Sequence, residues 1–184
     1  MSFPFDETKA TQAAAHALKR VGGSMNAYNL LKILYLANRE SLVQRGIPFT
    51  GDELRDLPDG PVAQTTYDLL KGSVGYWGRH ISKRVGYEVR VLEDPGEGAL
   101  SEYETRLLDG LVDRFGRLKY DELRAEAHRW PEHTETGSGA HVIDPEEILR
   151  SGGYTEEEIG RVRVSADEFV RLDRPGAAPT NSRA

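Results

Sequence analysis

Three histidines that lie close together in the sequence, with carboxylates around them, are the residues whose types could hold a metal ion. The histidines are His128, His133 and His141, and the nearby carboxylates are Glu126, Glu132 and Asp144. A catalytic zinc ion would take three such ligands and keep a fourth position open for water. However, His128 and His133 are separated by Trp130-Pro131, so they cannot share a helix face as the paired histidines of a helical zinc motif do. We therefore interpret these histidines as surface or packing residues, and we predict no metal site.

Residues for covalent or phosphate chemistry do not have the spacing that such chemistry requires. The chain has no cysteine, which excludes thiol catalysis and cysteine-ligated zinc or iron–sulfur sites. No serine stands in a G-x-S-x-G elbow, and Gly137-Ser138-Gly139 is better explained as a flexible loop. No glycine cluster has the G-x-x-x-x-G-K spacing of a phosphate-binding loop. The sequence therefore predicts no catalytic residue and no cofactor.

A segment rich in aromatic and basic residues could instead contact a partner. Its members are Tyr76, Trp77, Arg79, His80, Lys83, Arg84 and Tyr87. Three interpretations are open. The segment is a solvated face, or it is a protein contact anchored by Tyr76, Trp77 and Arg79, whose types interfaces favour. In the third interpretation it contacts nucleic acid by stacking bases on its aromatic rings.

Four carboxylates gather around a segment rich in turn-forming residues: Asp52, Glu53, Asp56 and Asp59. In one interpretation the aspartates form the turns, because Asp readily bonds its own backbone there. In the other, they form an acidic lip that meets a basic surface of a partner protein.

The charge of the chain is unevenly distributed. The formal net charge is −6 and the pI is about 5.4, which argues against duplex nucleic acid as a partner. Residues 76–91 nevertheless carry four basic side chains and one acidic side chain. Residues 93–116 carry seven acidic and two basic side chains, and residues 144–158 carry six and one. A basic segment is therefore predicted to lie between acidic helical segments.

The sequence contains neither a long apolar run nor an export signal. No stretch of about 18 uninterrupted apolar residues is present, so we expect no membrane span. The start, MSFPFDETKATQ, lacks the cationic and apolar segments of a secretory signal. We expect a cytoplasmic protein.

The elements that must position these residues are mainly helices. Apolar spacing predicts helices over residues 6–21, about 25–44 and about 61–71, the second of them apolar almost all round and therefore central. Alternation of apolar and polar residues predicts a β-hairpin over about 77–92 that turns near Gly86. Asp59-Gly60-Pro61 is predicted to form a stiff elbow before the third helix.

Further helices are predicted in the second half of the chain. Ser101 and Glu104 form a capping box for a helix at about 102–115, and another helix follows at about 120–129. Two short capped pieces begin at Asp144 and Thr155. The predicted fold is mainly α, a single compact helical domain over residues 1–172 around the buried central helix. Residues 173–184 are predicted to be a disordered tail.

The order and spacing of several motifs resemble a known family. Leu-Leu-Lys-Ile-Leu-Tyr-Leu-Ala at 30–37, Gly46-x-Pro48, the elbow and a following tyrosine occur in sequence, and a helix ending in histidine comes later. This pattern resembles the Panacea domain of the SocA-like antitoxin family over residues 10–135. Asp59 departs from the pattern, in which an aromatic residue is usual. The family-matching residues are Leu31, Lys32, Leu34, Tyr35, Gly60, Pro61, Val62, Tyr67 and His128. We interpret the two tyrosines among them as core aromatics with bonded hydroxyls.

The resemblance implies a protein that works by binding. It implies direct neutralisation of a co-encoded toxin or, in one branch, delivery of the toxin to a cytoplasmic protease. From the residues, we predict toxin contacts at Asp52, Asp56, Asp59, Tyr76, Trp77, Arg79 and Arg84. On this view, Trp77→Ala weakens the complex without unfolding the domain. A DNA-binding regulator is the alternative of a different class, but none of the predicted helices has a first turn with several exposed basic residues.

Overall fold

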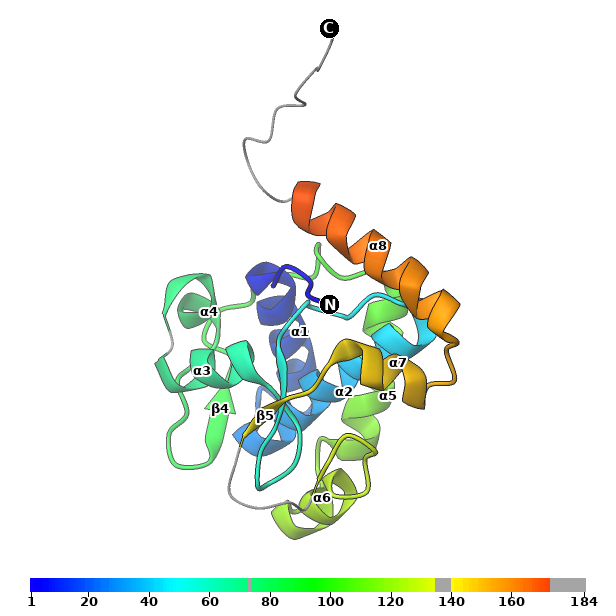
Figure 1. Ribbon diagram of the computed structural model, residues 1–184. Coiled ribbons are helices and arrows are strands. Elements are labelled where there is room, and N and C mark those ends of the chain that lie inside the picture. Colours follow the sequence, from blue (N-terminus) through cyan, green and yellow to red (C-terminus); the bar gives the residue numbers. More distant parts are fainter. Residues whose placement is uncertain (73, 135–139, 173–184) are drawn as a thin grey trace, which may run out of the picture.

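Helix α2 (Ala27–Arg45) runs through the middle of the molecule, as the sequence predicts (Figure 1). The computed structural model describes residues 1–72, 74–134 and 140–172. The side chain of Asn26 caps the first turn of α2, and Gly46 ends the helix in a left-handed conformation. Apolar residues are buried on all sides of α2, which confirms a mainly helical fold built around a central helix.

Helices α1 (Glu7–Arg20) and α5 (Glu102–Phe115) pack against α2 and against each other. Asp6 caps α1 by accepting a hydrogen bond from the Lys9 amide at 2.8 Å. The predicted capping box of α5 is present, with Ser101 and Glu104 each bonding the other's backbone amide. Alanines on α1 make its buried face thin, so the three helices approach closely.

The predicted hairpin forms over a shorter range than expected. Residues 81–91 run antiparallel around a turn at Gly86, through bridges that join Ile81 to Val91 and Val85 to Glu88. The preceding residues form helix α4 (Gly75–His80) rather than strand, which corrects the predicted start at 77. Strand β4 (Glu88–Arg90) also pairs antiparallel with β1 (Ser24–Asn26), just before α2. The hairpin is thus attached to the start of the central helix.

A second, three-stranded sheet has the order β3-β2-β5. It consists of β2 (Leu54–Asp56), β3 (Val62–Ala63) and β5 (His141–Val142), all antiparallel. The chain turns between β2 and β3 at residues 57–60, then enters α3 (Gln64–Gly72). Because Val62 and Ala63 are in a strand, α3 begins three residues later than the predicted helix start.

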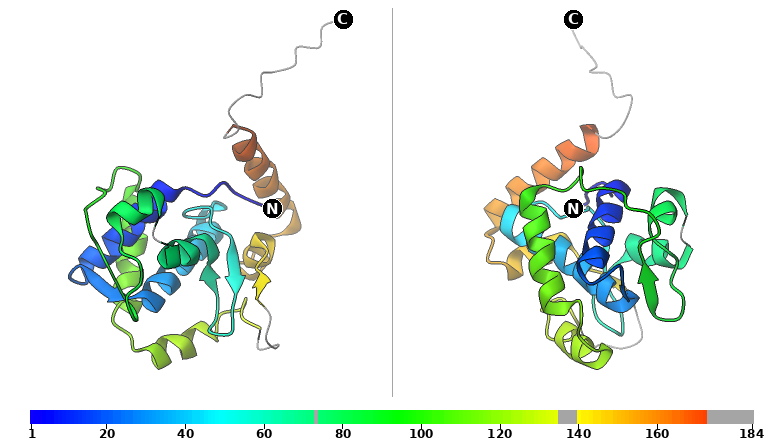
Figure 2. Two further views of the ribbon diagram at one scale, coloured as in Figure 1. Left: turned by 90° about the vertical axis from the view of Figure 1, so that its left-hand side faces the viewer. Right: turned by 180° about the vertical axis from the view of Figure 1, so that it is seen from behind.

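The remaining helices lie at opposite ends of the molecule. Helix α6 (Tyr120–Ala127) lies at one end, and α8 (Glu156–Leu172) lies at the other, joined to the centre through α7 (Pro145–Ser151) (Figures 1 and 2). One hydrophobic core extends from Ala10 on α1 to Ile159 on α8. Within the described residues, no helix is both long and apolar enough to cross a membrane. The predicted tail at 173–184 and the predicted loop Gly137-Ser138-Gly139 lie outside the described residues.

Candidate functional site

A groove of about 720 Å³ opens where the start of α2, the turn at 57–60, α3, the hairpin and α6 meet. We call it the tyrosine groove, because four tyrosines from four segments line it: Tyr28, Tyr67, Tyr87 and Tyr120. Its floor is formed by buried apolar side chains, including Leu31, Val62 and Leu70. A concave, apolar floor with a few polar groups at its edge is the usual form of a binding site.

Two of the tyrosines that line the tyrosine groove are exposed. Tyr87 is 77% exposed and Tyr120 is 42% exposed, although both are large rings. Val74, Val85 and Leu92, all from the segment around the hairpin, are also exposed. Large exposed apolar groups that gather in one region of a folded protein mark an interaction surface more often than isolated ones do.

Close contacts with α6 and with Lys32 fix the conformation of the turn at 57–60. Gly60 has a φ of +87°, and its amide donates to the Leu57 carbonyl at 2.7 Å. A Cβ atom at Gly60 would lie 2.9 Å from the Cβ of Ala127 on α6 and 3.3 Å from Nζ of Lys32. Only glycine fits both this conformation and this close approach.

Lys32 stabilises this turn from the interior of the protein. Its side chain is 0% exposed, and its Nζ donates to the carbonyl of Pro61 at 2.7 Å. The same ammonium lies 4.9 Å from the centre of the Tyr28 ring. Burial lowers the pKa of Lys32 to about 7, and the negative charges of Asp59 and Asp56 oppose part of this shift.

Side chains from α2 and α6 fix the rim of the groove at Asp59. The Tyr28 hydroxyl donates to the Asp59 carbonyl at 2.6 Å, and the Tyr120 hydroxyl donates to its Oδ1 at 3.0 Å. Nε of Arg124 donates to the same Oδ1 at 3.2 Å. The rings of Tyr28 and Tyr120 lie 4.8 Å apart at 54°. The groove is therefore largely preformed, because these contacts link three separate segments.

The cations of the hairpin region differ from most other charges of the molecule. Arg20 pairs with Asp113, and Arg163 pairs with Glu146, so side chains of both acidic stretches have basic partners. In contrast, within the described part of the chain, these hairpin-region cations form no ion pair: Arg79, Lys83, Arg84 and Arg90. The basic segment predicted from the sequence is therefore a surface of unpaired positive charge.

Two distant parts of the sequence meet further along α2, one to two helical turns beyond the residues that contact the groove's turn. Glu132 is buried and accepts hydrogen bonds from the Tyr35 hydroxyl at 3.0 Å and from Nε of Arg39 at 3.0 Å. The ring of Trp130 stacks on that of Tyr35 at 5.1 Å between centres. Burial, with the adjacent Glu132 charge, raises the pKa of Tyr35 well above its ordinary value. Tyr35 is thus a core aromatic that ties α2 to the segment after α6.

Residues 30–132, which run from α2 to Glu132, match the family model described as antitoxin SocA-like, Panacea domain. The chain belongs to the SocA-like antitoxin family. The match covers more than half of the chain and lies within the range 10–135 that the sequence motifs indicate. Neither the search of curated proteins nor the search of solved structures finds a match to this family member.

Apart from His128, the residues that match the SocA-like family lie on α2, in the turn before β3, in β3 and on α3. Leu31, Lys32, Leu34 and Tyr35 are buried on α2, and Gly60, Pro61 and Val62 form the supported turn and β3. Tyr67 is half-buried, and Nζ of Lys71 lies 3.7 Å from the centre of its ring. The family motifs therefore build the floor and the turn of the tyrosine groove.

His128, at the end of α6, stacks on His133 with 4.2 Å between ring centres. Its Nε2 is buried and forms no hydrogen bond with the described residues. Burial, and then the neighbouring His133, lowers the pKa of His128. His133 itself bonds Asp56 at 2.7 Å through Nδ1. No group of three or more potential ligands among the described residues could hold a metal ion.

Three of the predicted toxin contacts are interior residues, which corrects their assignment. Trp77 is 0% exposed and packs in the hydrophobic core. Asp56 is buried against His133 and the amide of Thr134, and Asp52 is buried at the start of α3. A side chain in the interior cannot reach a partner that docks on the folded surface. Asp59 and Arg84 do line the groove, whereas Tyr76 and Arg79 lie outside the lining, on α4.

Asp52 acts as the cap of α3. Its carboxylate accepts hydrogen bonds from the amides of Thr65 and Thr66 at 2.7 and 2.9 Å and from the Thr66 hydroxyl at 2.7 Å. Burial raises the pKa of Asp52 although these hydrogen bonds act in the opposite direction. We expect Asp52→Ala to lower the free energy of unfolding by about 1–2 kcal/mol, because amides at the helix start lose their acceptor. Urea denaturation measures this loss, and a matched change of exposed Glu53 to alanine should leave stability nearly unchanged.

Tyr28, Tyr87 and Tyr120 line the groove, but the sequence singles out neither Tyr28 nor Tyr120. Tyr87 was included only as part of the basic segment. No local pattern marks the other two, because 92 positions separate Tyr28 from Tyr120 and only the fold brings their rings together.

Proposed function

We propose that this protein is an antitoxin that neutralises a co-encoded toxin by direct protein–protein binding, and that the tyrosine groove is part of the contact surface. The observation that carries the proposal is a preformed groove, lined by exposed tyrosines, in a member of an antitoxin family. Tyrosine and arginine are the residues that dominate binding energy at protein interfaces. Both are present here, in Tyr87, Tyr120 and Arg84.

A supported groove is suited to this role because little ordering is needed when a partner binds. Gly60, Lys32 and Asp59 already fix the turn, and the Tyr28 and Tyr120 rings already contact each other. Each rotamer-rich side chain that must be immobilised at an interface costs about 0.5–1.5 kcal/mol. A preformed rim avoids much of this loss, which favours tight binding.

Co-expression with the neighbouring open reading frame tests the proposal. We expect the wild-type chain to restore growth and to co-purify with the neighbouring protein as a stable complex. If neither growth rescue nor a complex is obtained, the proposal is wrong. If the neighbouring protein instead disappears, and only in cells that contain a cytoplasmic protease, the chain acts as a delivery adaptor rather than by occlusion.

Tyr87→Ala is expected to weaken this complex by about 2 kcal/mol, or roughly 30-fold in Kd. The side chain is exposed, so its removal takes contact area from the interface without opening the core. Phe169→Ala on α8 is the matched control, because Phe169 is also an exposed aromatic residue but is not part of the groove lining. Isothermal titration calorimetry gives both affinities. Equal losses for the two variants would place the contact elsewhere.

A further inference from the structure

The side chains around the tyrosine groove define the chemistry of a segment that could occupy it. Its floor is apolar, and Leu31, Val62 and Leu70 reach it from three different elements. A volume of about 720 Å³ accommodates a few side chains rather than a whole domain surface. The best-fitting occupant therefore inserts an apolar or aromatic side chain and continues along the rim.

The charged side chains that line the groove indicate which charge the bound segment carries. Arg84 lines the groove and has no ion-pair partner among the described residues. Lys71, on the same rim, has only an exposed pairing with Asp68 at 3.7 Å, which contributes little. Asp59 is the acidic residue of the lining, and its Oδ1 already accepts from Tyr120 and Arg124. Arg84 is therefore available to a partner, Lys71 has only an exposed ion pair and a contact with the Tyr67 ring to exchange, and the Asp59 carboxylate is engaged.

The surroundings extend this positive character beyond the rim. Lys83 and Arg90, on the hairpin that carries Arg84 and Tyr87, are exposed and also lack ion pairs within the described residues. The hairpin therefore carries several unpaired cations in a chain whose net charge is −6. An acidic partner segment would meet complementary charge there.

The tyrosine rings are arranged less favourably for nucleic acid. Nζ of Lys71 covers the Tyr67 ring at 3.7 Å, and Tyr28 and Tyr120 are tilted against each other. These rings are already engaged, whereas base stacking needs an open aromatic face.

We propose that the tyrosine groove receives a segment of the partner protein in which an apolar or aromatic side chain is flanked by carboxylates, and that Arg84 and Lys71 bind those carboxylates. This rests on the proposed function, in that the partner is the co-encoded toxin. The apolar side chain provides anchoring on the floor, and the carboxylates fix the register of the segment against the rim. The groove is then specific for partner segments that carry both an apolar side chain for its floor and carboxylates for Arg84 and Lys71.

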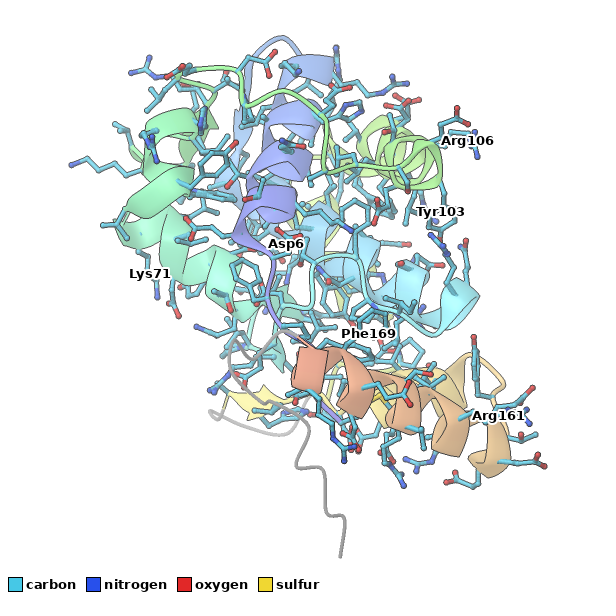
Figure 3. The ribbon with its side chains drawn as sticks, turned by 90° about the horizontal axis from the view of Figure 1, so that it is seen from above. Asp6, Lys71, Tyr103, Arg106, Arg161 and Phe169 are labelled. Atoms are coloured by element: carbon cyan, nitrogen blue, oxygen red, sulfur yellow. The ribbon has the colours of Figure 1, made fainter. Side chains whose placement is uncertain are left out.

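The double variant Lys71→Glu with Arg84→Glu tests the proposal. Both side chains are exposed, so the variant should fold. The matched control is Arg161→Glu, because Arg161 is also exposed and lies on α8, on the opposite side of the molecule from Lys71 (Figure 3). We expect the double variant to bind the co-expressed partner at least about tenfold more weakly, equivalent to about 1.4 kcal/mol, and the control to bind normally. Unchanged binding by the double variant would overturn the proposal.

A selection that needs no toxin separates this proposal from the proposed function. Phage-displayed random short peptides are selected on the immobilised full chain, with the double variant as the counter-target. We expect recovery of peptides with an apolar or aromatic residue beside Asp or Glu, and their loss on the double variant. Recovery of basic peptides, or equal recovery on both proteins, would contradict the proposal. Groove-dependent binding of a fluorescent single-stranded oligonucleotide, lost in the double variant, would also overturn it in favour of nucleic acid.

Failure of the acidic-segment proposal and failure of the proposed antitoxin function give different experimental results. If the wild-type chain rescues growth and the double variant does so equally well, the antitoxin function stands and the acidic segment is wrong. If acidic peptides bind the groove but no neighbouring protein is neutralised, the groove chemistry stands and the antitoxin function is wrong.

Discussion

Trp77→Ala is expected to lower the free energy of unfolding by about 3–5 kcal/mol. Trp77 is 0% exposed and is among the largest fully buried side chains of the protein. It lies on α4, which packs against α1, and its backbone amide donates to Glu7 at 3.0 Å. Removing the indole leaves a cavity between these helices. Because domains are commonly stable by only about 5–15 kcal/mol, such a loss is a large part of the total.

Chemical denaturation followed by circular dichroism measures this effect. Val74→Ala, just before the same helix, is the control, because Val74 is exposed and its truncation should change stability by no more than about 0.5 kcal/mol. The result also separates two roles for Trp77. A variant with wild-type stability and a weakened complex would mean that Trp77 is a contact residue, contrary to its burial.

The stability of the wild-type protein should rise with pH above neutrality because of Lys32. In the unfolded chain Lys32 has its ordinary pKa of 10.5, and burial lowers its pKa to about 7 in the folded protein. Between these pH values the unfolded state binds more protons than the folded state, so stability increases with pH. At its steepest, one such group contributes about 1.4 kcal/mol per pH unit. Below about pH 7, both states are protonated and this contribution levels off.

Lys32→Met should remove this pH dependence, since methionine cannot titrate. The variant also leaves the Pro61 carbonyl without its donor, which lowers stability by about 1–3 kcal/mol at high pH, where wild-type Lys32 is neutral. Urea denaturation at a series of pH values from 6 to 10 gives both quantities, with exposed Lys83→Met as the control. If the wild type and Lys32→Met show parallel pH profiles, Lys32 is not the titrating group.

The helices could be predicted from the sequence because their signals are local. The Ser101 and Glu104 capping box and the near-continuous apolar surface of α2 both lie within single elements, and both are present in the structure. The pairing of β1 with β4 could not be predicted in this way. It joins Ser24 to Arg90 across much of the chain, and neither short strand carries a signal of its partner.

The site was predicted less completely, for the same reason. Residue types drew attention to Asp59 and Arg84, and the fold places both in the lining of the groove. The period-two alternation that begins near Trp77 suggested a strand, but Gly75 with φ +67° allows a short helix, and α1 then buries the indole. Turn-forming composition around Asp52 and Asp56 did not show that tertiary hydrogen bonds bury both carboxylates.

The origin of the groove lining has a consequence for when the protein can act during its synthesis. Tyr28, Tyr67, Tyr87 and Tyr120 arrive at the groove from segments spread over half of the chain. A nascent chain that still lacks α6 has neither the Tyr120 ring nor the contact of Ala127 with the turn at Gly60. The complete groove thus exists only after translation has passed α6, so a partner that needs the whole groove can bind only to a chain synthesised at least that far.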